Sequence, residues 1–226
     1  MIKVKNNPAA TGSKQENKKG ATVSFFKAPI WNKSPKMTVS LFWVWLYVTM
    51  KWVQMGPDPD RDIGLVSKTE WLRKLTAEEA QRQYKGINFD YITPAGTFSY
   101  CDDNSIVEYS NMLCLDLDHL DDDSPAMTRK VTPDEMKQLL LQDHYWGERT
   151  LLMFTSPRGH GVKWLVEIDL AKCDYRTWFT ALRNYLLTTY GLGEKQVDSS
   201  VANISHACFL SYDPDAYLRH DLYEFF

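Results

Sequence analysis

The segment at residues 111–118 constrains this chain more than any other, because an apolar run ends there in two carboxylates. Its sequence, Asn-Met-Leu-Cys-Leu-Asp-Leu-Asp, predicts a buried strand. Successive side chains of a strand point to opposite faces, so Asp116 and Asp118 share one face. Two neighbouring carboxylates need a cation between them, and Mg²⁺ or Mn²⁺ suits such oxygen ligands. Alternatively, one aspartate caps a turn and the other is solvated.

Charge is spread unevenly along the 226 residues. The net charge is −3, but residues 1–36 carry eight Lys and one Glu, which leaves about −10 for the remainder. The net value argues against wholesale electrostatic binding of nucleic acid. We expect a disordered basic tail at residues 1–22. An N-terminal α/β subdomain at 23–110 and a second subdomain at 111–226 would follow, integrated into one domain.

Cysteine usage and hydropathy indicate a cytoplasmic protein. The four cysteines are scattered without Cys-x-x-Cys spacing, so neither a zinc knuckle nor a disulfide framework is predicted. The most apolar run, residues 41–48, is too short to span a membrane, and the N-terminus lacks a signal-peptide pattern. We therefore expect reduced thiols and no membrane association.

In the first half, periodicity predicts a strand at 24–30, a helix at 37–54, two short helices around 71–83, and strands at 89–92 and 97–100. Ser67 with Glu70, and Thr76 with Glu79, match the spacing of capping boxes for the two short helices.

The second half has a clearer order of elements. Strands are predicted at 111–118, 150–155, 162–168 and 207–212, with helices opened by Thr132 and spanning 174–190. The order β-α-β-β-α-β predicts an α+β fold of the ferredoxin-like (RRM-like) plan, with helices on one face of an antiparallel sheet. The other face would be open and would carry the aspartates there or at its rim. The N-terminal α/β extension would pack on this half.

The turn between the two middle strands has the composition of a phosphate cradle. Ser156 offers a hydroxyl, Gly159 and Gly161 allow close backbone approach, and Arg158 and Lys163 supply positive charge. A plain hairpin loop explains the glycines as well. The segment lacks the stacking aromatics that RNA-recognition modules carry at this position, which weakens a purely RNA-binding interpretation.

A site for two metal ions usually needs a third carboxylate, and Asp198 is the candidate because it lies just before the last strand. An aspartate in an ordinary turn is the alternative. Asp213 and Asp215 are interpreted as turn residues. The acids within residues 58–62 imitate a calcium loop, but the required glycine and terminal glutamate are missing.

Three segments together resemble the signature of the archaeo-eukaryotic primase (primase–polymerase) superfamily: Leu-Asp-Leu-Asp at 115–118, Ser-Pro-Arg-Gly-His-Gly-Val-Lys at 156–163, and Val-Asp at 197–198 with Phe-Leu-Ser-Tyr at 209–212. The nearest likeness is to the primase-like N-terminal domain associated with VirE-type helicases of mobile elements, the BT4734-like N-terminal domain. Residues 84–99 resemble the segment before its first acid motif. The likeness extends over roughly residues 23–218.

The resemblance implies a nucleotidyltransferase that adds nucleotides to a nucleic-acid strand through two Mg²⁺ or Mn²⁺ ions on Asp116, Asp118 and Asp198. It further implies a set of residues that bind the nucleoside triphosphate: Ser156, Arg158, Gly159, His160, Gly161, Lys163 and His206. Two positions depart from the superfamily. Lys163 stands where His is usual, and His206 stands where Arg is common, and a histidine is charged only part of the time near neutral pH.

The expected partners are a single-stranded DNA template and a helicase, fused or separate. Arg73 and Lys85 are weak candidates for contacts to the template backbone, and surface solubility explains them equally well. Two other functions stay open. One is a metal-dependent nuclease; the other is a non-catalytic or degenerate module that binds single-stranded nucleic acid.

Overall fold

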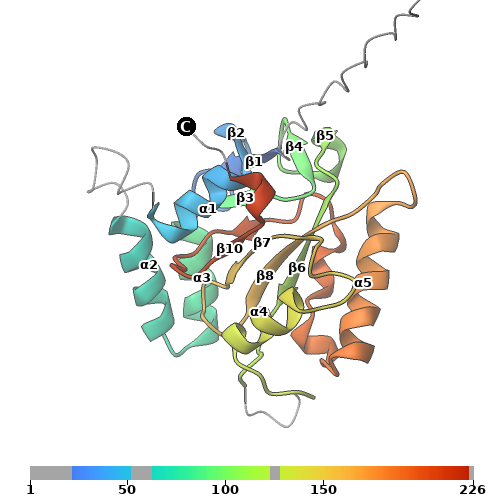
Figure 1. Ribbon diagram of the computed structural model, residues 1–226. Helices are drawn as coiled ribbons and strands as arrows, with labels where there is room; N and C mark the ends of the chain where they lie inside the picture. Colours follow the sequence, from blue (N-terminus) through green and yellow to red (C-terminus); the bar gives the residue numbers. More distant parts are fainter. Residues whose placement is uncertain (1–21, 52–62, 123–127, 224–226) are drawn as a thin grey trace, which may run out of the picture.

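The computed structural model describes residues 22–51, 63–122 and 128–223, and these form a mixed α+β fold (Figure 1). The basic tail predicted at 1–22 and the acids within residues 58–62 lie almost entirely outside the described residues. Within the described part, no helix has the length and apolar character that crossing a membrane requires.

The first half contains strands β1 (Thr22–Phe26), β2 (Met37–Ser40), β3 (Tyr91–Thr93), β4 (Gly96–Phe98) and β5 (Ile106–Tyr109), and helices α1 (Leu41–Thr49), α2 (Ile63–Lys74) and α3 (Glu78–Asn88). The predicted helix at 37–54 was wrong in its first turn, because residues 37–40 pair with β1. Ser40 then caps α1 by accepting a hydrogen bond from the Trp43 N–H.

The two capping boxes predicted in this half are not formed. Ser67 and Glu70 lie inside α2, which begins at Ile63. The N-cap of α3 is Ala77, which has no side chain to accept a hydrogen bond. The box at Thr132 is present, with Glu135 bonding back to the Thr132 N–H. Spacing alone therefore identified one helix start of three.

The second half contains strands β6 (Met112–Leu117), β7 (Thr150–Thr155), β8 (Val162–Glu167), β9 (Cys208–Phe209) and β10 (Tyr217–Leu218), and helices α4 (Pro133–Leu141) and α5 (Tyr175–Thr189). Short 3-10 helices occupy Glu194–Gln196 (η4) and Ser199–Ala202 (η5). The predicted strands 111–118, 150–155 and 162–168 and the predicted helix 174–190 are confirmed to within one residue at each end.

One sheet has the strand order β10-β7-β8-β6, and a second has the order β2-β1-β3-β9, with every pair antiparallel. The strand predicted at 207–212 shrinks to β9 and joins the second sheet beside β3, not β6. The free edge of β6 is met only by a single bridge between Leu117 and Val197. Extended pairing stops there because Asp198 caps η5 through the Ser200 N–H.

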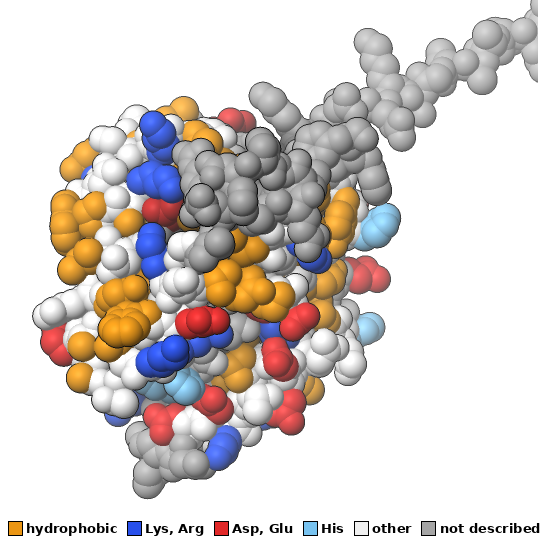
Figure 2. All heavy atoms as spheres, turned by 90° about the vertical axis from the view of Figure 1, so that its left-hand side faces the viewer, with side chains coloured by type: hydrophobic (Ala, Val, Ile, Leu, Met, Phe, Trp, Pro, Cys, Tyr) orange, Lys and Arg blue, Asp and Glu red, His pale blue; other side chains and the backbone are white. Residues whose placement is uncertain are grey.

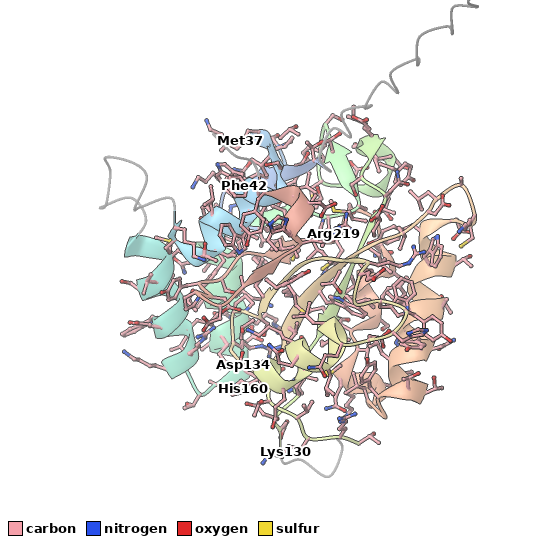
Figure 3. The ribbon with its side chains drawn as sticks, viewed as in Figure 1. Met37, Phe42, Lys130, Asp134, His160 and Arg219 are labelled. Atoms are coloured by element: carbon pink, nitrogen blue, oxygen red, sulfur yellow. The ribbon has the colours of Figure 1, made fainter. Side chains whose placement is uncertain are left out.

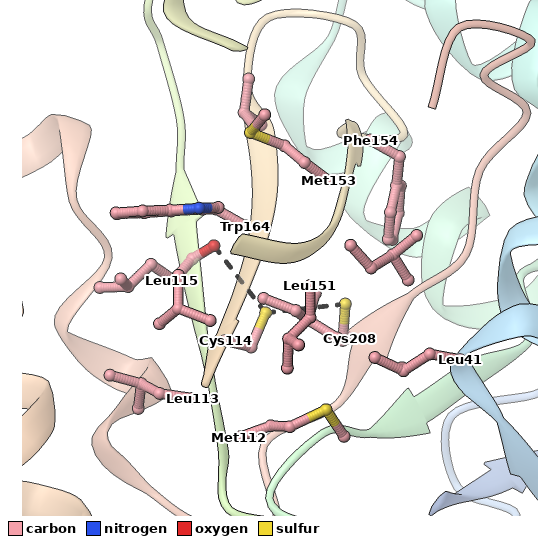
Figure 4. Close-up of a cluster of buried hydrophobic side chains, with 14 of the residues drawn as sticks. Leu41, Met112, Leu113, Cys114, Leu115, Leu151, Met153, Phe154, Trp164 and Cys208 are labelled. Atoms are coloured by element: carbon pink, nitrogen blue, oxygen red, sulfur yellow. Dashed lines mark hydrogen bonds between the residues drawn. The ribbon is translucent and has the colours of Figure 1, made fainter. Parts of the chain in front are cut away.

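The face of the sheet that carries Asp116 is covered along most of its length, which the sequence interpretation had left open. Helix α4 packs on β7 and β8, and α5 packs on β6. These helices lie on the face opposite Asp116. On the face that carries Met112, Cys114 and Asp116, the sulfurs of Cys114 and Cys208 lie 3.9 Å apart, and Figure 4 shows Leu41 of α1 beside Met112. One apolar core, running from Val23 to Leu218, fills both sides. Asp118, which follows the end of β6, is partly exposed.

Candidate functional site

The two acids of β6 lie in different environments at the end of that strand. Asp116 is buried and forms an ion pair with Lys163, which is its cross-strand neighbour on β8. Burial acts to lower the pKa of Lys163, but nearby carboxylates, Asp116 first, raise it above its ordinary value. Lys163 is therefore a permanent ammonium. Asp118 follows the strand and its side chain is 20% exposed.

Asp198 lies next to these two acids, on the segment that runs along the free edge of β6. Its backbone N–H donates to the Asp116 carbonyl at 3.0 Å, and the Asp118 N–H donates to the Gln196 carbonyl at 3.1 Å. Burial raises the pKa of Asp198, but two hydrogen bonds from Ser200 outweigh burial and lower it. A short backbone ladder thus joins Asp198 to Asp116 and Asp118, about 80 residues earlier in the chain. The lowered pKa keeps Asp198 ionised at neutral pH.

The turn between β7 and β8 needs both of its glycines. Gly159 has φ +90°, which disfavours other residues, and a Cβ on Gly161 would lie 2.0 Å from the Leu117 carbonyl oxygen. The turn is closed by bonds from the Ser156 N–H to the Gly161 carbonyl and from the Gly159 N–H to the Ser156 carbonyl. Gly161 therefore lets the hairpin lie directly against the end of β6.

The polar side chains of this turn point in three directions. Arg158 lies 3.5 Å from the Asp118 carboxylate and 3.8 Å from Glu78 of α3. His160 is exposed and pairs with Asp121, and Figure 3 places it at the same end of the molecule as Asp134 at the start of α4. Ser156 is buried, and its hydroxyl has no hydrogen-bond partner among the described residues. The turn thus brings Arg158, but not His160, to the acids.

Lys85 and His206 complete the charged cluster. Burial, then the charge of Lys163, lowers the pKa of Lys85, and the charges of Asp116 and Asp118 oppose this, so the Lys85 ammonium feels the charge of all three. Its Nζ also lies 5.1 Å from the centre of the Phe209 ring. Burial and Lys163 lower the pKa of His206 to about 4. The imidazole is therefore neutral at pH 7, contrary to the partial charge expected from sequence.

Arg73 has a supporting position. Its Nε donates to the Pro157 carbonyl at 3.4 Å, and the side chain covers Gly159. Sequence reasoning gave Arg73 and Lys85 the same weak role, but the structure separates them: Lys85 lies beside the acids and Arg73 braces the turn.

A cavity of about 530 Å³ opens at this end of the sheet. We name it the acid cavity, because it is lined by five carboxylates and one lysine: Glu78, Asp118, Asp122, Glu194, Asp198 and Lys195. Of the three candidate ligands, Asp118 and Asp198 line the acid cavity, while Asp116 is buried and does not line it. No sequence pattern points to Glu78 or Glu194, because they lie in separate helices, α3 and η4. The α2 and α3 side of the molecule, shown in Figure 2, carries interspersed acidic and basic side chains rather than a uniform basic patch.

The carboxylates of Asp116, Asp118 and Asp198 partly suit the divalent cations that the sequence implies. In favour, Asp118 and Asp198 share the acid cavity, and the buried Oδ1 of Asp116 has no hydrogen-bond partner among the described residues. Against, Lys163 already neutralises Asp116, and the described residues contain no group of three or more His, Cys, Asp or Glu side chains arranged to hold a metal. The donors are carboxylate oxygens, the kind of ligand that a divalent cation prefers, and Asp118 and Asp198 are the two that the acid cavity makes accessible.

Asp213 begins a turn, as predicted, because the Asp215 N–H donates to its Oδ1 and the Ala216 N–H to its carbonyl, and it has a further structural role. It is buried, accepts a hydrogen bond from the Thr155 N–H at 2.7 Å and pairs with Lys137 of α4 at 3.2 Å. It therefore fastens α4 to β7, a role that no local pattern indicates.

These features define an α+β protein with an acidic and basic centre where two antiparallel sheets meet. The family model described as BT4734-like, N-terminal domain, matches residues 87–218, and the chain belongs to this family. The match includes the three acids, the β7–β8 turn and His206, while Arg73 and Lys85 precede it. No curated protein and no solved structure matches the chain.

Proposed function

We propose that this protein is a primase–polymerase-like nucleotidyltransferase, which adds nucleotides to a nucleic-acid strand at the acid cavity. The observation that carries the proposal is the backbone bond from Asp198 to Asp116, which holds three acids together beside a cationic hairpin. Membership of the archaeo-eukaryotic primase superfamily is part of this proposal. It is supported by the order β7-β8-β6 with α4 and α5 packed on these strands, which is the order that a ferredoxin-like sheet would have.

In this proposal Asp118 and Asp198, with the free oxygen of Asp116, hold Mg²⁺ or Mn²⁺. Such ions would lower the pKa of an attacking 3′-hydroxyl and neutralise the pyrophosphate leaving group. The 3′ oxygen bonds to the α-phosphorus of a nucleoside triphosphate as pyrophosphate leaves.

The basic residues of the cluster would hold the triphosphate. Arg158 pairs with the partly exposed Asp118 and the exposed Glu78, and Lys85 is in no ion pair within the described residues, so these two are the cations we expect to exchange their contacts for phosphate oxygens. Lys163 would not bind the triphosphate, because it forms an ion pair with Asp116 and holds that carboxylate in position. His206 is neutral and would donate or accept a hydrogen bond without adding charge. A DNA template, a helicase partner and a cytoplasmic location complete the proposal.

Primer extension on a single-stranded template, with Mg²⁺ or Mn²⁺, tests the proposal. Asp118→Asn keeps the shape of a partly exposed residue and removes its charge, so we expect incorporation to fall at least 10- to 100-fold. Asp169→Asn is the matched control, because Asp169 follows the opposite end of β8 and should leave the rate unchanged. Full incorporation by the Asp118→Asn variant would contradict the assignment.

A second function is favoured by one observation, the pairing of Lys163 with Asp116. A carboxylate neutralised by a permanent ammonium is a weaker metal ligand, which suits a degenerate module that only binds a nucleic-acid strand. Incorporation absent from the wild type, with strand binding unaffected by Asp118→Asn, would identify this function. Metal-dependent cleavage of the strand without nucleotide addition would instead identify a nuclease.

A further inference from the structure

A second hollow adjoins the acid cavity and has the opposite charge. It has a volume of about 370 Å³, lies between α5 and η5, and shares Ser199 with the acid cavity. Two arginines and no acidic residue line it. We name it the α5 groove; the lining residues used below are Arg176, Thr180, Arg183, Asn184, Ser199 and Asn203.

The α5 groove follows from the spacing of polar residues on one helix. Arg176, Thr180, Arg183 and Asn184 are separated by four, three and one residues, which places them along one side of α5. The helix rises 1.5 Å per residue, so the Cα atoms of the two arginines lie about 10 Å apart along its axis.

Arg183 connects the groove to the candidate site. Its Nε and Nη2 each donate at 3.3 Å to the carbonyls of Val197 and Glu194, the segment that leads to Asp198. Its Nη2 also lies 3.8 Å from the Glu194 carboxylate, so part of its charge is already paired, and the remaining N–H donors of the guanidinium are left for a ligand at the groove. Arg176 is exposed and forms no ion pair within the described part of the chain. Arg183 is thus held by the segment before Asp198, and Arg176 is free to contact a ligand.

We propose that the α5 groove binds the sugar-phosphate backbone of a single nucleic-acid strand and leads that strand to the acid cavity. Phosphates fit the groove because its lining offers Arg, Asn, Ser and Thr donors and no acidic residue, although the Glu194 carboxylate lies 3.8 Å from Arg183 at the end next to the acid cavity. They do not fit the acid cavity without cations, since five carboxylates line it. Ser199 lies between the basic groove and the acid cavity, so the bound part of the strand would end there and its reacting 3′ terminus would enter the acid cavity.

The chemistry of the lining determines what kind of binding this is. Phe179 is the single aromatic residue of the groove and is buried, so stacking on bases is not offered there. Contacts to phosphate oxygens carry no sequence information. The groove therefore binds strands regardless of sequence, and its binding weakens with salt. The direction toward the acid cavity rests on the proposed function, but the binding itself does not.

The test uses the full chain and a fluorescent oligothymidine, with binding measured by anisotropy in metal-free buffer over a range of salt concentrations. For Arg176→Gln we expect the slope of log K against log salt to fall in magnitude by about 0.7, the value for one phosphate contact on a single strand. At 0.1 M salt this corresponds to about fivefold weaker binding. Arg176→Glu should weaken binding further. Arg183 is not substituted, because it also holds the segment of Asp198.

Arg149→Gln is the matched control, since it removes the same charge from an exposed residue that lies against Trp146. Wild-type affinity and salt slope in Arg176→Gln would overturn the proposal, as would an equal loss in both variants or a wild type that binds no strand. These outcomes are separate from those of the proposed function. A wild type that incorporates no nucleotide, yet loses salt-dependent binding with Arg176→Gln, would refute the polymerase and leave the groove standing.

Discussion

At the scale of single residues, the ion pair between Asp116 and Lys163 has more consequences than any other contact of the site. Asp116 is 5% exposed and Lys163 is 3% exposed, so removal of either partner leaves the other charge buried. Such a loss typically costs about 3–5 kcal/mol of the free energy of unfolding, whereas replacement of both partners by apolar residues of similar size is often neutral.

We therefore predict that Asp116→Asn and Lys163→Met each destabilise the protein by about 3–5 kcal/mol, and that Asp116→Leu combined with Lys163→Met restores most of this loss. Urea unfolding of the single and double variants measures both effects. Asp118→Asn is the control: Asp118 is partly exposed, so we expect a change of about 1 kcal/mol or less. Single substitutions that cost no more than this control would show that the pair is not the buried contact described.

Several candidate residues lie near one another, but their roles in a functional site stay predictions. Strand alternation, which predicted a shared face for Asp116 and Asp118, depends only on local geometry. The glycines of the turn were predicted to cradle phosphate; in the structure Gly159 has a positive φ and Gly161 packs against the Leu117 carbonyl, and a phosphate at the turn stays a prediction. The partner of Lys163, the neutral state of His206 and the outward position of His160 depend on burial and on contacts between distant elements. Local pattern carries no information on these.

At the scale of elements, Lys137 and Asp213 fasten helix α4 to strand β7. Burial acts to raise the pKa of Asp213, but the Thr155 N–H and the charge of Lys137 outweigh it, so the pKa lies below the ordinary value. A carboxyl whose pKa is lowered by folding stabilises the protein above its unfolded pKa of about 3.9, and this stability is lost as pH falls through the folded pKa.

The prediction is that Asp213→Asn lowers the free energy of unfolding at pH 7 and makes its decrease below about pH 4 shallower than in the wild type. Thermal unfolding followed from pH 7 to pH 2 measures the difference. Asp215→Asn serves as the comparison, because Asp215 is exposed two residues away. If Asp213→Asn and the wild type lose stability in parallel as the pH falls, Asp213 does not have the lowered pKa described here.

Elements were predictable where one local signal determined them. The capping box of α4 gave the start of that helix, and the apolar periods of β6, β7, β8 and α5 gave their bounds to within one residue. β2 and β9 were missed or misplaced because each is very short and exists through pairing with a strand far away in the sequence. Non-local pairing of this kind cannot be derived from propensity.

At the scale of the whole molecule, the two halves of the chain are interlocked. β9 belongs to the second half in sequence but completes the sheet of the first half, and α1 packs on β7 and β10. The apolar core contains residues of both halves, among them Phe25, Ile92, Leu115 and Leu210. A boundary near residue 110 therefore describes the order of the sequence but does not separate two cores.

This interlocking predicts that residues 111–226 do not fold by themselves. Their sheet would expose Met112 and Cys114 to water, and β9 would lose its only strand partner in the described structure, β3. Because a buried core residue is typically stabilised by about 1.5–3 kcal/mol, the loss of one whole covering layer exceeds the 5–15 kcal/mol that stabilises an ordinary domain. Circular dichroism and hydrogen exchange of this fragment should show no cooperative unfolding, whereas residues 22–226 should unfold cooperatively. A fragment 111–226 with a sharp thermal transition would mean that the second half has a core of its own and that the first half is an accessory layer.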